Sequence, residues 1–343
     1  MTRWLRRPIV WLPITIALLG LVAWRTRPWE AGGVLVRLDA APLMVAIILN
    51  GVVMLLWAAR SADLLGAAGR PVPIRPLIPM TALANTINGL TPGSVGELLR
   101  LYLLRVRHGV DYSSGAAVVL IERVVAIGYL AGSAAIAWAI HLAGLPDAFA
   151  SVGFVILAIL PALVYRLGIR PSVLVTALPL GRVIGRERWV RTTANLGRID
   201  TTIGELLTHP VRLTIFAGST TLILVVYTGQ LCLIAGAAGI SIDPLVAWGA
   251  LGLSITVGVL SFLPFGLGAT DLVLATLLSS LGIDPPAAAA IVLGYRLTTT
   301  APLALIGSLS YGYLSATLPA GGPADAMRQA SQALDVPGSD GAP

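Results

Sequence analysis

The sequence contains few of the side chains that bind metals or form disulfides. It has a single cysteine, Cys232, which excludes a disulfide framework or a cysteine-based metal site. Its three histidines lie far apart in the sequence and near predicted span ends, a placement typical of a membrane interface rather than a metal site. We therefore expect no metal and no cofactor. The histidines are His108, His141 and His209.

The sequence also lacks lysine, and charged residues make up only 11% of it. A soluble domain carries about 25% charged residues. The 23 basic residues are all arginine and lie mostly between apolar segments. This pattern is typical of membrane topology control and lipid headgroup contact, and it argues against nucleic-acid binding.

Long apolar segments, in contrast, recur from residue 8 to residue 315 at about the 20-residue length that crosses a bilayer. They predict an all-α polytopic membrane helix bundle, with residues 1–318 forming one integral membrane domain. The predicted spans are 8–24, 41–59, 114–140, 147–165, 211–238 and 285–315. The first resembles a signal peptide, but no cleavage motif follows it, so we interpret it as an uncleaved span.

The rest of the chain is polar or low in complexity. Residues 166–210 are predicted to be a cytoplasmic connection that carries an amphipathic helix. This helix lies either on the membrane surface or against the domain. Residues 319–343 are rich in Gly, Ala, Pro and Asp and are predicted to be a disordered cytoplasmic tail.

Two further apolar stretches are interrupted, and each is predicted to be a re-entrant broken-helix hairpin. The first covers 77–90 and breaks at Pro92, and the second covers 244–263 and breaks at Pro264. The short helices that follow are predicted at 94–106 and 268–281. With both termini cytoplasmic, this topology places 18 arginines inside and three outside, as the positive-inside rule requires. We expect a multi-pass protein of the plasma membrane.

The two halves resemble each other. Asp111 stands 12 positions before Arg123, and Asp284 stands 12 positions before Arg296. In the topology above the two hairpins enter from opposite sides, so the repeat is predicted to be inverted, as in many transporters. Chance similarity between Gly- and Pro-rich segments is the alternative. The half-repeats cover about 41–140 and 211–315, and both aspartates are predicted helix N-caps.

Ionisable residues within the predicted membrane region are the main candidates for a binding site. An arginine at the bilayer centre costs about 2.5–3.5 kcal/mol on insertion scales, so such groups must pair or line a wet cavity. We expect them to converge on one cavity that binds an anionic headgroup. The alternative is a set of ion pairs that only fixes helix packing. The candidates are Glu97, Glu122, Asp271, Arg123 and Arg296.

The two breaks supply a second set of candidates. Glycine lets backbone N–H groups approach a ligand closely, and the N-terminus of a helix favours anions. Together with Arg100, the breaks would suit a phosphate. The alternative is that the glycines only make turns and allow close packing. The candidate glycines are Gly93, Gly96, Gly266 and Gly268.

Taken together, these motifs resemble the lysylphosphatidylglycerol synthase transmembrane region, also called the flippase-like domain family, over about residues 40–315. The first family motif resembles residues 88–100, and it adds Asn88 to the candidate site. The second resembles residues 264–271, and the family's Glu-Arg pair and later Arg resemble Glu122-Arg123 and Arg296.

The sequence also departs from the family pattern. Ser94 stands where many members have Arg, Phe265 replaces a Gly, and Asp271 replaces a Glu, which leaves the pairing of this acid open. We expect no soluble synthase domain of the kind that the best-known members carry, because the sequence after residue 315 is too short for one. The resemblance therefore implies the lipid-translocating part of such proteins.

The function that we expect is a flippase or transporter rather than an enzyme, because the sequence has no Walker, zinc-protease or nucleophile-elbow motif. The expected substrate is an anionic phospholipid or a polyprenyl-phosphate-type lipid. Two alternatives remain open: a membrane-embedded transferase acting on lipid phosphates, and an accessory membrane subunit of a glycosyltransferase.

Overall fold

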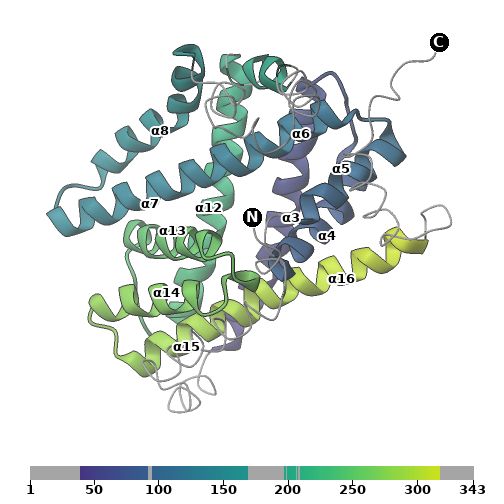
Figure 1. The fold of residues 1–343 in the computed structure, drawn as a ribbon. Helices are drawn as coiled ribbons and strands as arrows, with labels where there is room; N and C mark the ends of the chain where they lie inside the picture. Colours follow the sequence, from purple (N-terminus) through teal and green to yellow (C-terminus); the bar gives the residue numbers. More distant parts are fainter. Residues whose placement is uncertain are drawn as a thin grey trace, which may run out of the picture.

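The computed structural model describes residues 39–91, 95–168, 197, 199–205, 207 and 209–316. These residues form helices and no strand, which confirms the all-α bundle (Figure 1). The predicted first span, the tail 319–343 and most of the connection 166–210 lie outside the described residues.

Five helical segments are long and apolar enough to cross a membrane, and they match the predicted spans after the first. Three are single helices: α3 (Ala40–Ala67), α8 (Ala148–Arg166) and α12 (Pro210–Ala237). Helix α3 continues beyond the predicted end of the second span at residue 59, through the polar residues Arg60 and Ser61. The side chains of both residues find partners inside the protein.

The other two long segments each contain a π-helical turn. The first runs from Tyr112 to Ala143, and the second runs from Pro285 to Ala316. A π turn widens the helix locally and is frequent at functional sites. The parts of the first are α6 (Tyr112–Leu120), η2 (Ile121–Val125) and α7 (Ala126–Ala143). The parts of the second are α15 (Pro285–Tyr295), η4 (Arg296–Thr300) and α16 (Ala301–Ala316).

Two pairs of shorter helices occupy the predicted hairpins. The first pair is α4 (Ile74–Leu90) and α5 (Val95–His108). The second pair is α13 (Pro244–Leu260) and α14 (Ala269–Ser280), with the short helix η3 (Pro264–Gly266) between them. The second break therefore lies where the sequence predicts it. Residues 92–94 of the first break are outside the described residues.

The two halves match closely in their local structure. Helices α3 and α12 both have 28 residues, and α4 and α13 both have 17. Both long broken spans have 32 residues. Asp111 and Asp284 each cap their span by accepting a hydrogen bond from the backbone N–H three residues later. These features support a repeat, and its inverted orientation stays a prediction.

Each hairpin packs against the broken span of the other half. Helix α13 lies along α7, and α4 lies along α16 (Figure 1). Small residues allow both crossings: a Cβ at Gly252 would lie 2.5 Å from the Cβ of Ala134, and one at Gly307 would lie 2.7 Å from the carbonyl oxygen of Ala82. Close crossings at small residues are typical of membrane helices.

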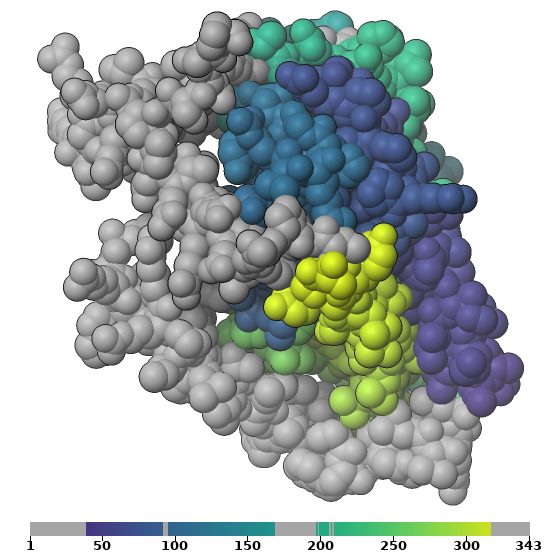
Figure 2. Space-filling view, turned by 90° about the vertical axis from the view of Figure 1, so that its right-hand side faces the viewer, coloured from purple at the N-terminus to yellow at the C-terminus, as the bar shows by residue number. Residues whose placement is uncertain are grey.

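Apolar side chains cover much of the outer surface. Exposed examples are Ile48 on α3, Phe149 on α8 and Leu309 on α16. Figure 2 shows α3 and α16, in purple and yellow, on one face of the molecule. Such a surface suits contact with lipid chains. The buried core contains polar and charged residues in addition to its apolar clusters.

Candidate functional site

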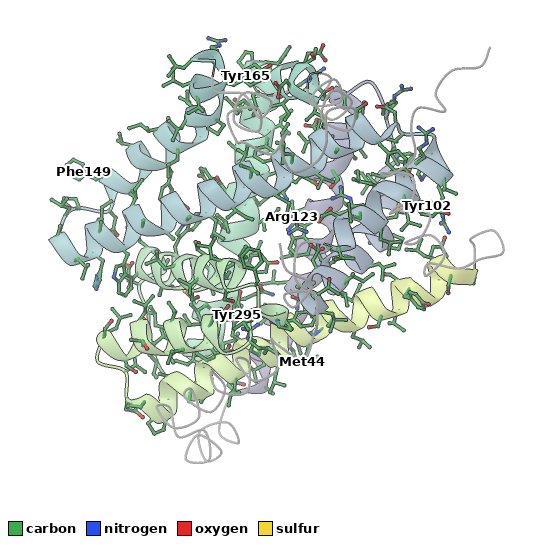
Figure 3. The ribbon with its side chains drawn as sticks, viewed as in Figure 1. Met44, Tyr102, Arg123, Phe149, Tyr165 and Tyr295 are labelled. Carbon is green, nitrogen blue, oxygen red and sulfur yellow. The ribbon has the colours of Figure 1, made fainter. Side chains whose placement is uncertain are left out.

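The candidate site contains two networks of hydrogen bonds, one in each half. In the first, Arg123 on η2 donates from Nε to Oε1 of Glu97, at 2.9 Å. Its Nη2 donates to Asn85 at 3.1 Å. Glu97 lies in the first turn of α5 and also accepts from Asn88, at 3.0 Å. The structure thus brings together three of the predicted residues, Arg123, Glu97 and Asn88. Figure 3 labels Arg123 near the centre of the molecule.

Arg100 and Glu122 form the buried part of the same network. Nη1 of Arg100 donates to Oε2 of Glu122 at 2.6 Å, and Nη2 donates to Ser61 at 2.6 Å. Nη1 also lies 3.4 Å from Glu97. The Arg100 and Glu122 side chains are only 3% and 6% exposed. A buried pair with additional hydrogen bonds offsets its own desolvation, which an isolated charge cannot do.

Arg60 lies beside this network and was not among the predicted site residues. Its Nε is 3.9 Å from Oε1 of Glu122, and its Nη1 donates to Thr220 on α12 at 3.3 Å. Its guanidinium lies over the ring of Phe216, 5.5 Å from the centroid. Sequence reasoning assigned Arg60 only to topology, because it stands near the end of an apolar run.

The second network is centred on Arg296, at the start of η4. Its Nε donates to Oδ1 of Asp271 at 2.7 Å, and its Nη1 donates to the carbonyl oxygen of Phe265 at 2.8 Å. The other carboxylate oxygen of Asp271 accepts from the N–H of Gly268 at 2.9 Å. Asp271 therefore caps the N-terminus of α14 and also holds Arg296. It does so although its side chain is shorter than the glutamate of the family pattern.

The two networks share one design. In each, an arginine on a π turn donates from Nε to a carboxylate at the third residue of a short helix. No hydrogen bond or ion pair joins the two networks among the residues that the structure describes. They are neighbours through packing, because a Cβ at Gly89 on α4 would clash with the ring of Phe265. Convergence on a single cavity stays a prediction.

Three of the candidate glycines are engaged within the protein. Gly96 is buried against α4, where a Cβ would clash with the carbonyl of Ala84. The N–H groups of Gly266 and Gly268 donate to Leu263 and Asp271. These contacts fit the packing and turn roles that we considered as the alternative. Gly93 lies outside the described residues.

An apolar cavity of about 470 Å³ lies apart from both charged networks, between α7, α8 and α12. Its lining includes Tyr129, Phe154, Ala217 and Gly218. None of the predicted site residues lines it. Among the described residues, no group of three or more His, Cys, Asp or Glu side chains is placed to hold a metal ion.

These features define a polytopic, all-α membrane protein with ion-pair networks inside its spans. The chain belongs to the family described as Lysylphosphatidylglycerol synthase TM region, which matches residues 10–307. The match confirms the resemblance found in the sequence and supports a membrane, lipid-related role. A comparison with curated proteins found no match.

Proposed function

We propose that this chain is a flippase or transporter that moves a phospholipid or a lipid-phosphate-linked substrate across the bilayer, and that it is not itself an enzyme. The observation that carries the proposal is the position and exposure of Arg123. It is the twelfth residue of a 32-residue span, about 17 Å from the start. A helix of 32 residues is about 48 Å long and the hydrocarbon is about 30 Å thick, so a centred span places Arg123 within the hydrocarbon, about 8 Å from its edge. An ionisable residue at that depth is a functional candidate by default.

Arg123 differs in accessibility from the rest of its network. Its side chain is 35% exposed, whereas those of Glu97, Arg100 and Glu122 are 3–6% exposed. Glu97 and Asn85 hold Nε and Nη2 of Arg123 in place. Nη1 makes no hydrogen bond within the described part of the chain, so it is the nitrogen that a ligand would reach. A guanidinium forms strong charge-assisted hydrogen bonds to phosphate oxygens, so an anionic headgroup fits this position.

The apolar cavity supports a lipid substrate independently. Helix α8, which lines it, is the least buried of the five candidate spans. The hydroxyl groups in the lining are already engaged: Tyr129 with Thr221, Ser151 with Ala148, and Thr214 with Pro210. An acyl chain is therefore a suitable occupant. In this proposal the chain lies in the plasma membrane with both termini cytoplasmic.

Transbilayer movement of fluorescent anionic lipid in proteoliposomes tests the proposal, with thermal stability measured in detergent. We expect Arg123→Ala to abolish movement while most of the protein stays folded. We expect Arg123→Lys to restore movement only in part, because lysine keeps the charge and loses the planar fork.

Three outcomes would contradict the proposal. Normal lipid movement by the Arg123→Ala variant would show that Arg123 does not bind the substrate. A chemical change in the headgroup, seen by mass spectrometry, would instead indicate a transferase. Co-purification with a glycosyltransferase and no movement by the wild-type chain would indicate an accessory subunit.

A further inference from the structure

The network of the first half carries one net positive charge. Three guanidinium groups, those of Arg60, Arg100 and Arg123, face two carboxylates, those of Glu97 and Glu122. The second network is balanced, because Arg296 faces Asp271. An uncompensated charge inside a span is costly, and a bound anion would reduce that cost.

The surplus charge belongs to Arg60. Arg100 and Arg123 each form a close ion pair, whereas Arg60 reaches Glu122 only at 3.9 Å. Within the described part of the chain, its hydrogen bond goes to the neutral hydroxyl of Thr220. Among the same residues, its buried Nε has no hydrogen-bond partner, and neither has the Nε of Arg100. The Arg60 side chain is only 11% exposed, so water does little to stabilise its charge.

The matched position in α12 of the second half carries no cation. Arg60 is the twenty-first residue of α3, and the twenty-first residue of α12 is Gln230. Gln230 is neutral and donates to the carbonyl oxygen of Ala46 at 2.8 Å. The two networks thus differ in net charge because of the residue at this one matched position. The ion pairs that both halves share do not cause the difference.

We propose that Arg60 is a specificity residue that, with Arg123, makes the first network select one singly charged anion of the phosphate-ester class. The inference rests on the proposed function, because it concerns the headgroup of the same substrate. Arg60 lies beside Glu122 and is within electrostatic range of Arg100 and Arg123. An anion near Arg60 and Arg123 would neutralise the network. A zwitterionic headgroup brings no net charge and leaves the surplus in place.

The test compares Arg60→Gln, which copies the residue of the second half, with Arg60→Lys. Purified protein in detergent is titrated with phosphatidylglycerol or phosphatidylcholine in mixed micelles, and affinity is derived from the rise in thermal stability. We expect wild type to prefer phosphatidylglycerol, and Arg60→Gln to weaken that preference about tenfold, the factor given by 1.4 kcal/mol. Arg60→Lys should retain most of it.

The matched control is Arg70→Gln, which also removes one positive charge. Arg70 is 51% exposed and pairs with Asp111 outside the network, so its loss should leave the preference unchanged. Without ligand, Arg60→Gln should be at least as stable as wild type, because Glu122 keeps Arg100 and Ser61 as partners. Soluble glycerophosphoglycerol, a phosphodiester with the same single negative charge as the lipid headgroup, is titrated separately. Stabilisation by the lipid alone assigns the site to a lipid headgroup, and equal stabilisation by glycerophosphoglycerol assigns it to a free phosphate ester.

Two results would overturn the inference: a wild-type protein that does not distinguish the two lipids, or an undiminished preference in Arg60→Gln. Failure of the proposed function looks different. In that case the wild type binds phosphatidylglycerol preferentially and Arg60→Gln loses the preference, but no lipid moves across the bilayer.

Discussion

Nη1 of Arg100 lies 2.6 Å from Oε2 of Glu122, and both side chains are almost completely buried. The two residues come from different helices, α5 and the π turn of the first broken span. This pair therefore ties the short helix of the first hairpin to a long span. The pair differs from Arg123 in its exposure, because the Arg123 side chain is partly exposed.

We predict that Arg100→Met is strongly destabilising. The change leaves Glu122 buried with Ser61 and the distant Arg60, and loss of one partner from a buried pair typically costs about 3–5 kcal/mol. Thermal unfolding in detergent measures the effect. The double variant Arg100→Met with Glu122→Gln should recover much of the loss, because it removes the stranded charge. A double variant no more stable than Arg100→Met would contradict this explanation.

The two arginines on π turns should differ in their effect on stability. Among the described residues, Arg296→Ala leaves Asp271 with the N–H of Gly268 alone, and it removes a hydrogen-bond donor from the carbonyl of Phe265. In Arg123→Ala, by contrast, Glu97 keeps Arg100 and Asn88. We therefore expect a loss of about 3 kcal/mol for Arg296→Ala and of about 1 kcal/mol for Arg123→Ala. Denaturant titration would show the difference, and equal losses would argue against it.

Close packing between α16 and α4 gives a third prediction. A Cβ at Gly307 would clash with Thr86 and Ala82, so Gly307→Ala should cost about 1–3 kcal/mol of stability. Gly312 lies on the same helix with open space around it. Gly312→Ala should therefore be neutral or stabilising by up to about 1 kcal/mol, through helix propensity alone. Similar thermal stability of the two variants would show that the crossing tolerates expansion.

The N-cap Asp111 gives a prediction on pH. Burial raises the pKa of its carboxyl, but hydrogen bonds from Ser113 and Ser114 and the charge of Arg70 outweigh this and hold the pKa well below its usual value. A depressed folded-state pKa adds stability above the unfolded pKa, about 3.9, and this stability is lost as pH falls towards the folded pKa. Asp111→Asn keeps a good cap. Its deficit relative to wild type should be constant from about pH 5 to 7 and shrink below about pH 4. A deficit independent of pH would exclude the charge as its source.

The predicted inverted topology can be tested with single cysteines in a Cys232→Ser background. His108 and Ser280 are the last residues of α5 and α14, and both are exposed. If the hairpins enter from opposite sides, an impermeant thiol reagent should label His108→Cys from the cytoplasm and Ser280→Cys from outside. Labelling of both positions from one side would exclude the inverted repeat.

The sequence predicts the long helices well, because apolar length and arginine placement depend on the bilayer rather than on tertiary contacts. It does not predict the π turns. Ile121–Val125 has no local signal that distinguishes it from an α-helix, and its geometry is evident only in the structure.

The candidate site is predicted in part. Arg123 and Glu97 can be identified from the sequence because a charged side chain within the membrane is costly to bury and therefore needs a partner or a wet cavity. The partners Asn85 and Ser61 are polar but uncharged residues of other helices, and only packing shows that they are near. Arg60 is missed for a related reason: one arginine near a span end fits the topology rule as well as it fits a site.

Phe265 has a left-handed backbone, with φ of 51°, a conformation that favours glycine. That conformation costs about 1–2 kcal/mol for a residue with a side chain, and here the ring fills the space above Gly89. Positions 89 and 265 are therefore coupled sterically, although they lie in different halves of the chain. While Phe265 is present, a side chain at position 89 would force the ring to move. A sequence with glycine at 265 would leave room for a larger residue at 89, so we expect the two positions to change together among homologues.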